Sequence, residues 1–90
     1  MSATVSIPTI LQTLTANQKR INISGNNIGD IINNIENQYP GFKARVMSDG
    51  KIHPFMNIYV NEDDIRFREN LNTEVSSNDL ITILPAVAGG

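Results

Sequence analysis

The feature that most limits the fold of this chain is one run of isoleucines at helical spacing, placed between segments that alternate with a period of two. From the candidate N-cap Asn27 to the stop at Pro40-Gly41, apolar residues share one helix face: Ile28, Ile31, Ile32, Ile35 and Tyr39. Gly29 and several asparagines are poor helix formers. Packing against a sheet, more than intrinsic propensity, must therefore hold this helix.

Alternating apolar and polar residues predict strands on both sides of this helix. Before it, Thr4 to Pro8 and Lys19 to Ser24 alternate, and we expect them to pair as an antiparallel hairpin. After it, Phe55 to Val60 is the best candidate for a central strand, Ile65 to Phe67 for a short strand and Leu80 to Leu84 for the last strand. This order predicts an α+β domain in which one main helix packs across a mixed sheet.

Length and charge narrow the class of protein. Ninety residues are enough for one domain, which we place at residues 1–84, followed by an extended tail at residues 85–90. Seven basic against nine acidic residues give a net charge of -2, so no nucleic-acid partner is expected. No segment reaches the roughly 18 apolar residues of a membrane span, and no signal-peptide pattern is present. We therefore expect a cytoplasmic protein without a membrane partner.

Few side chains of this sequence suit catalysis or metal binding. The chain has no cysteine, which excludes disulfides, zinc–thiolate sites and a cysteine nucleophile. His53 is the only histidine, and no catalytic motif surrounds it. Glu62-Asp63-Asp64 fits a solvated turn better than a metal-binding loop, whose ligands are spaced further apart. We expect no enzymatic activity, no metal site and no cofactor bound by this chain.

The terminal Gly89-Gly90 pair is the feature with the clearest chemical use. It ends a tail of small residues that leaves the last strand and that includes Pro85, Val87 and Ala88. Because glycine has no side chain, such a tail fits a narrow channel and brings the Gly90 carboxylate close to another protein's catalytic centre. The five residues after Pro85 span about 17 Å when extended. A carboxylate is a poor acyl donor and needs activation, for instance as an acyl-adenylate. The alternative is an inert, frayed terminus.

Strand alternation also predicts an apolar patch near the root of this tail. If the even-numbered residues of 56–60 face the core, then Phe55 and Tyr59 face outward, and the same rule turns Leu84 outward on the last strand. Exposed apolar patches of this kind often mark partner sites. The alternative is that another part of the chain covers these side chains.

Three segments carry a resemblance to a known family: Val5 to Leu11, Asn57 to Asn61 together with Ile65-Arg66-Phe67, and Thr82 to Gly90. In these segments the chain resembles the ubiquitin-like sulfur carriers of the ThiS and MoaD group, and over its whole length it is most similar to the CysO type. The resemblance implies a β-grasp, ubiquitin-like fold. The Val-Ala-Gly-Gly ending is shared by several subfamilies, so it indicates the family better than the pathway.

The resemblance also implies a function. Gly90 would be adenylated by an ATP-dependent adenylyl- and sulfurtransferase enzyme and converted to a thiocarboxylate. In the CysO-type route its sulfur reacts on a pyridoxal-phosphate-dependent cysteine synthase that uses O-phosphoserine, and a zinc metalloprotease then releases cysteine. ATP, zinc and pyridoxal phosphate belong to these partners. The residues expected to contact partners are Gly89, Ala88, Val87, Pro85, Leu84, Tyr59 and Phe55.

Other readings remain open at this point. A molybdopterin-synthase small subunit or a thiazole-synthesis carrier uses the same terminal chemistry with a different sulfur acceptor. A ubiquitin-like protein modifier would instead join Gly90 to lysines of target proteins. A plain β-grasp interaction module would have an inert tail.

Overall fold

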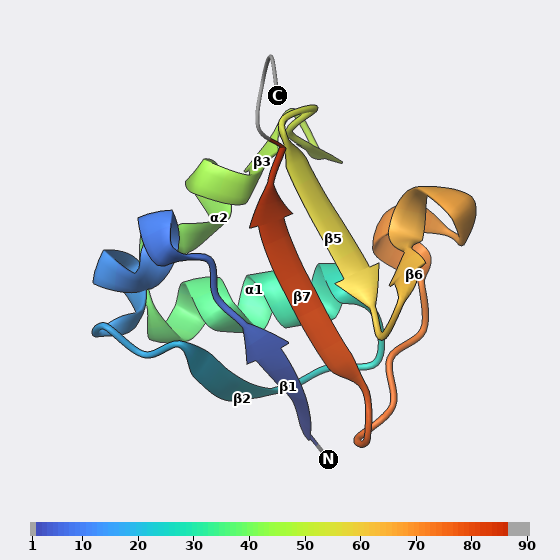
Figure 1. Ribbon diagram of the computed structural model, residues 1–90, viewed down its shortest axis with the longest axis horizontal. Coiled ribbons are helices and arrows are strands. Elements are labelled where there is room, and N and C mark those ends of the chain that lie inside the picture. Colours follow the sequence, from blue (N-terminus) through green and yellow to red (C-terminus); the bar gives the residue numbers. More distant parts are fainter. Residues whose placement is uncertain (1, 87–90) are drawn as a thin grey trace.

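Helix α1 (Ile28–Gln38) lies across one face of a five-stranded sheet in the computed structural model, which describes residues 2–86 (Figure 1). The strands of this sheet are β1 (Ser2–Ser6), β2 (Arg20–Ser24), β5 (Met56–Val60), β6 (Asp63–Asp64) and β7 (Leu80–Pro85). The remaining elements are η1 (Thr9–Thr15), α2 (Phe42–Val46), the small hairpin of β3 (Met47–Ser48) and β4 (Lys51–Ile52), η2 (Ile65–Phe67) and η3 (Asn70–Asn72). Among the described residues, no helix is both long and apolar enough to cross a membrane.

The sheet is mixed, with the order β2-β1-β7-β5-β6. β1 pairs antiparallel with β2, as the alternating segments predict, and parallel with β7. β7 also pairs antiparallel with β5 over the whole length of β5. β7 is therefore bonded to a neighbour on each side, and it joins the N-terminal hairpin to the second half of the chain.

Helix α1 forms where the isoleucine spacing predicts it. Its N-cap is Asn27, whose side-chain oxygen accepts the backbone N–H of Asp30 at 2.8 Å. The four isoleucines of its apolar face are buried against the sheet. The Glu36 carboxylate accepts the backbone N–H groups of Lys43 and Gly41, which holds its pKa below the ordinary value and ties α1 to the start of α2.

Two stretches depart from the simple alternation pattern. Residues 9–15 form the 3₁₀ helix η1, which buries Leu11 completely at one end of the core. The strand expected at Ile65 to Phe67 is wrong, because these residues form the 3₁₀ helix η2, while β6 pairs with β5 only at Asp63–Asp64. The Asp64 side chain accepts the backbone N–H of Arg66 at 2.9 Å, and this cap turns the chain away from the sheet.

We expect replacement of Ile35 by alanine to lower the free energy of unfolding by about 3 kcal/mol, because Ile35 is fully buried between α1 and the sheet. Ile10→Ala is the matched control, since Ile10 is 52% exposed on η1 and its truncation should change stability by less than about 0.5 kcal/mol. Urea denaturation followed by circular dichroism measures both values. Equal losses in the two variants would contradict the assignment of the core.

Candidate docking site at the root of the C-terminal tail

The last described residues remain aligned with β5. Pro85 is the final residue of β7 and lies opposite Met56, and the Ala86 N–H then donates to the Phe55 carbonyl oxygen at 2.6 Å. Figure 1 shows that the C-terminal end of β7 lies beside the N-terminal end of β5. The predicted tail residues Val87, Ala88, Gly89 and Gly90 lie outside the described residues. The division into a domain at 1–84 and a tail at 85–90 stays a prediction.

We call Pro85 and Ala86, where the chain leaves the sheet, the tail root. A short turn at residues 53–56, just before β5, connects the tail root to α2. The backbone N–H of His53 donates to the Val46 carbonyl oxygen at 2.9 Å, and the N–H of Met56 closes the turn on the His53 carbonyl oxygen at 3.0 Å. The His53 Nε2 atom lies 3.2 Å from the Ala44 carbonyl oxygen, to which it donates in the tautomer protonated there. The imidazole also stacks on the Phe55 ring, with centroids 4.9 Å apart and planes 10° from parallel. His53 therefore connects α2 with the residue that holds Ala86.

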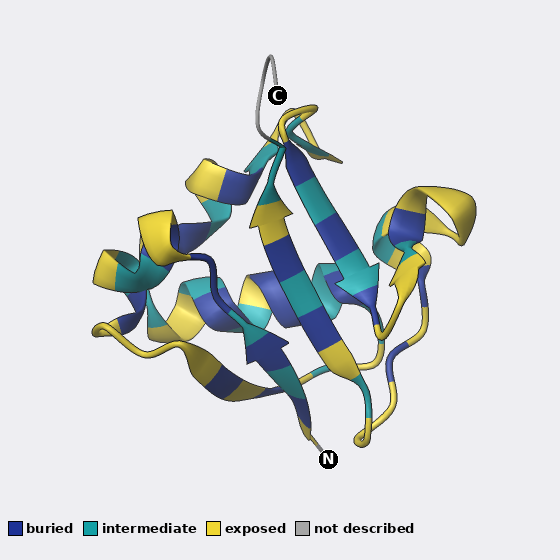
Figure 2. Cartoon of the chain, viewed as in Figure 1, coloured by how far each residue is buried: buried dark blue, intermediate teal, exposed yellow. Residues whose placement is uncertain are grey.

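Two of the three predicted patch residues, Tyr59 and Leu84, lie on neighbouring strands, and Phe55 lies in the turn before β5. Phe55 is 55% exposed and Leu84 is 45% exposed, whereas Tyr59 is half-buried. Figure 2 shows buried positions alternating with less buried ones along β5 and β7. Leu84 lies directly opposite Asn57 in the ladder, so Tyr59 is its diagonal neighbour on β5. We call Phe55, Tyr59 and Leu84 the tail-root patch. Its apolar groups adjoin the place where the chain continues toward Gly90.

A polar pair beside the patch escaped the sequence analysis. The Arg66 guanidinium donates from Nε and Nη2 to the Asp64 carboxylate, with a shortest distance of 2.8 Å, and Nη2 also reaches the side-chain oxygen of Asn57. These hydrogen bonds hold the pKa of Asp64 below its ordinary value and raise the pKa of Arg66 further. Only the i, i+2 spacing of opposite charges in the sequence hints at this pair.

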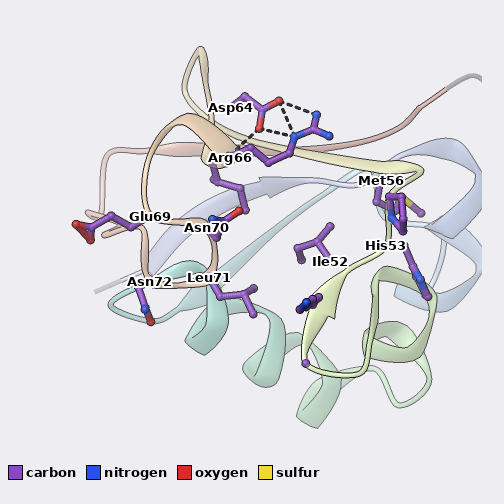
Figure 3. Close-up of a pocket in the computed structure, with 13 residues that line it drawn as sticks. Ile52, His53, Met56, Asp64, Arg66, Glu69, Asn70, Leu71 and Asn72 are labelled. Atoms are coloured by element: carbon purple, nitrogen blue, oxygen red, sulfur yellow. Dashed lines mark hydrogen bonds and ion pairs between the residues drawn. The ribbon is translucent and has the colours of Figure 1, made fainter.

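The Asp64–Arg66 pair lies at the rim of a hollow of about 500 Å³ between the β4 turn and residues 64–72. Figure 3 shows the pair on one side of this hollow, with His53 and Met56 across from it. Within residues 2–86, no group of three or more histidine, cysteine, aspartate or glutamate side chains is arranged to hold a metal ion. The groups that the fold gathers around the tail root are thus apolar contacts, one ion pair and backbone hydrogen bonds.

The arrangement of one helix across a mixed sheet of this order defines the ubiquitin-like β-grasp class. The model of the ThiS family matches residues 5–90, and the chain belongs to this family. It is 50% identical over 93 aligned positions to the sulfur carrier protein CysO of Mycobacterium tuberculosis, with all of both chains covered. The relatives of this name are described as sulfur carrier proteins, which agrees with the expectation that the chain is not an enzyme.

Two solved structures extend the comparison. A chain of the Amycolatopsis orientalis BexX/CysO complex is 48% identical and superposes with a TM-score of 0.93, covering 98% of this chain and 99% of that chain. The small archaeal modifier protein 1 of Methanosarcina acetivorans is 27% identical with a TM-score of 0.83, covering 100% of this chain and 99% of that chain. The fold is therefore similar to that of a sulfur carrier and to that of a protein modifier.

We expect Leu84→Asp to leave the fold intact, because the Leu84 side chain faces outward and its replacement should cost less than about 1 kcal/mol. The matched control is the adjacent Ile83→Asp, which buries a carboxylate in the core and should unfold the domain at pH 7. Thermal unfolding followed by circular dichroism separates the two results. A folded Ile83→Asp variant or an unfolded Leu84→Asp variant would overturn the assignment of the two faces.

A second prediction concerns the pH dependence of the Asp64–Arg66 pair. Because the pKa of Asp64 is lowered in the folded protein, its carboxylate stabilises the fold above its ordinary pKa of about 3.9, and this contribution disappears as the pH falls through the lowered value. Asp64→Asn keeps an oxygen that can cap Arg66 but removes the charge. We expect the variant to have a lower Tm than the parent at pH 7 and a smaller difference in Tm at pH 3, where the stabilising contribution of the carboxylate is already partly lost. An equal difference at both pH values would contradict the role of the ion pair.

Proposed function

We propose that this protein is a sulfur carrier whose Gly90 carboxylate is adenylated and then converted to a thiocarboxylate. The observation that carries the proposal is the continuation of β7 past Pro85, where the Ala86 N–H bonds to Phe55 beside an exposed apolar patch. A tail of small residues that ends in Gly89-Gly90 follows directly. Membership of the ThiS family and the similarity to proteins named sulfur carriers support this reading.

The chemistry requires a partner at each step. A terminal carboxylate oxygen attacks the α-phosphorus of ATP on the activating enzyme, and pyrophosphate leaves. A hydrosulfide ion then attacks the acyl carbon of the adenylate, the bond between this carbon and the phosphate oxygen breaks, and AMP leaves with that oxygen. The product carries one sulfur in place of one oxygen at Gly90. No side chain of the carrier takes part in these bond changes, so its contribution is to bring the acyl carbon to the enzyme.

The tail-root patch supplies the contact for docking in this proposal. Phe55 and Leu84 expose apolar surface that a partner can bury, with Tyr59 completing the patch and Pro85 at the start of the tail. Val87, Ala88 and Gly89 would then pass through the partner's channel. The stacking of His53 on Phe55 and the hydrogen bond from the Ala86 N–H to the Phe55 carbonyl oxygen connect this docking surface to the start of the tail.

For the sulfur acceptor, we propose the cysteine route of the CysO type. A pyridoxal-phosphate-dependent cysteine synthase that uses O-phosphoserine would take the sulfur, and a zinc metalloprotease would release cysteine. The similarity over the full length to proteins named CysO favours this route over molybdopterin or thiazole synthesis. A second candidate is protein modification through Gly90, which the likeness to an archaeal modifier protein favours.

We expect incubation with the activating enzyme, ATP and a sulfur source to increase the mass of the intact protein by about 16 Da, the difference between one sulfur and one oxygen atom. Intact-mass spectrometry measures the change. The control variant lacks Gly90 and should remain unmodified under the same conditions. Absence of the heavier species in the parent protein, with an activating enzyme that is active on another carrier, would refute the proposal.

The two candidate functions give different products from the same thiocarboxylate. Addition of the cysteine synthase and O-phosphoserine should yield a carrier extended by one cysteine in amide linkage, which intact-mass and fragment spectra identify. Adducts to lysines of other proteins that survive thiol treatment would instead establish a modifier. If the synthase leaves the thiocarboxylate unchanged, the cysteine route is wrong, although the carrier function stands.

A further inference from the structure

The hydrogen-bonded support of β7 decreases stepwise toward the tail. β1 pairs with β7 up to Ser6 and Thr82, and past Pro8 the chain turns away into η1. Over residues 83–86, the pairing that the structure describes is with β5 alone. Figure 1 shows β7 running on beyond the end of β1, with β5 at its side. The point at which the tail leaves the sheet therefore depends on β5 and on the residues just before it.

The ladder between β5 and β7 has a fixed alternation of bonded pairs. In an antiparallel ladder, every second facing pair exchanges backbone hydrogen bonds. The Ala86 N–H donates to the Phe55 carbonyl oxygen at 2.6 Å, so these two residues form a bonded pair. Continued in the same register, the next bonded position would place Ala88 opposite His53.

Both backbone groups of His53 are already bonded elsewhere. Its N–H donates to the Val46 carbonyl oxygen at 2.9 Å, and its carbonyl oxygen accepts the Met56 N–H at 3.0 Å, which closes a turn. Pro54 occupies the second position of this turn, where its fixed φ favours the turn conformation. The imidazole of His53 adds its stacking on Phe55. The backbone before Met56 therefore bends away from the line of β5 instead of continuing the strand.

We propose that the turn at residues 53–56 stops the ladder between β5 and β7, so that pairing ends at Ala86 and residues 87–90 stay available to a partner. We call this turn the ladder stop. The inference rests on the proposed function, because a carrier that delivers a terminal carboxylate needs a tail of constant length. His53 and Pro54 are positioning residues in it, since they act through the backbone of the ladder.

The ladder stop sets the reach of the terminal carboxylate. Four residues follow Ala86, and they span about 13 Å when extended. Pairing that ran on to Ala88 would leave two residues and about 7 Å of reach. The added pairing would also have to break before the tail entered a channel, so only the unpaired fraction of the carrier would react. A ladder that ends at Ala86 keeps every carrier molecule in the reactive state.

Amide hydrogen exchange of the free carrier, followed by NMR, tests the ladder stop without any partner. We expect the Ala86 N–H to exchange at least about tenfold more slowly than in an unstructured chain, and the Ala88 N–H to exchange at the unprotected rate. Slow exchange at both positions would mean that the ladder runs past the stop. Fast exchange at both would mean that it ends earlier. Either result would overturn the proposal.

Removal of the ladder stop is the second arm. The ladder-stop variant combines His53→Val with Pro54→Val, which takes away the imidazole contacts and the fixed φ and introduces residues that favour strands. We expect its Ala88 N–H to exchange about tenfold more slowly than in the parent. Unchanged exchange at Ala88 in the folded variant would contradict the role of these two residues.

The matched control for this arm is Pro40→Val. Pro40 also holds the second position of a turn that a backbone hydrogen bond closes, there at 3.2 Å, but this turn lies between α1 and α2. We expect Pro40→Val to leave the exchange at Ala88 unchanged, and a slowing equal to that of the ladder-stop variant would overturn the proposal. Circular dichroism verifies folding. If the double variant is unfolded, Pro54→Val alone is measured, with the same direction expected.

Tail length provides the functional arm. With the activating enzyme and ATP, the ladder-stop variant should lose about tenfold in kcat/KM for pyrophosphate release, because a tenfold slower exchange corresponds to about nine tails in ten being paired. Duplication of Val87-Ala88 in this variant adds two residues and keeps the last four unchanged. It should restore kcat/KM to within about threefold of the parent.

The outcomes of the functional arm separate the two proposals. A loss of kcat/KM that the longer tail does not restore would assign the effect to an altered surface and overturn the ladder stop as the determinant of reach. An unchanged kcat/KM in a variant whose Ala88 N–H is protected would overturn it as well. Failure of the parent to release pyrophosphate, with an enzyme active on another carrier, would refute only the proposed function, since the exchange measurements need no partner.

Discussion

The pairing of β7 with β5 is the interaction on which the rest of this structure depends. The register that places Ile83 opposite Ile58 turns both side chains into the core, and it turns Leu84 toward solvent. Continued by one step, the same ladder brings Ala86 to Phe55. Because strand side chains alternate with a period of two, a slip of β7 by one residue would turn Leu84 into the core and Ile83 toward solvent. Hydrophobic burial and the position of the tail root therefore have a single cause.

The helices α1 and α2 support the pairing of β7 with β5 indirectly. α1 buries its isoleucines against the sheet, and the Glu36 carboxylate ties the start of α2 to α1. α2 in turn accepts the hydrogen bonds of His53, which packs on Phe55. A connected set of contacts thus runs from the core helix to the residue that holds the tail root. The only histidine of the chain has a structural explanation in this set, and no catalytic role is needed to account for its place.

Periodicity predicted the parts of this fold that packing determines. The isoleucine spacing defined α1, and alternation assigned the outward side chains of β5 and β7 correctly, since each pattern reports one buried face. The same rule failed at Ile65 to Phe67. Their apolar, polar, apolar order is typical of a strand, but the Asp64 side chain caps the backbone of Arg66 and the segment forms a 3₁₀ helix. The contact of His53 with Ala44 and the reach of Arg66 to Asn57 join residues far apart in sequence, and no local pattern contains them. The role of Gly90 rests on its sequence and family alone.

In a carrier of this kind, the terminal carboxylate and the folded domain have different tasks. The reacting carboxylate belongs to the backbone, so the tail can be nearly the same in carriers that serve different acceptors and in modifiers. Enzymes that distinguish these proteins must therefore contact the surface of the folded domain. On this chain, the surface beside the tail root combines the exposed Phe55 and Leu84 with the Asp64–Arg66 pair, whose guanidinium reaches Asn57 opposite Leu84. An apolar contact alone discriminates weakly between partners, whereas a partner that fails to match an oriented ion pair leaves polar groups unpaired.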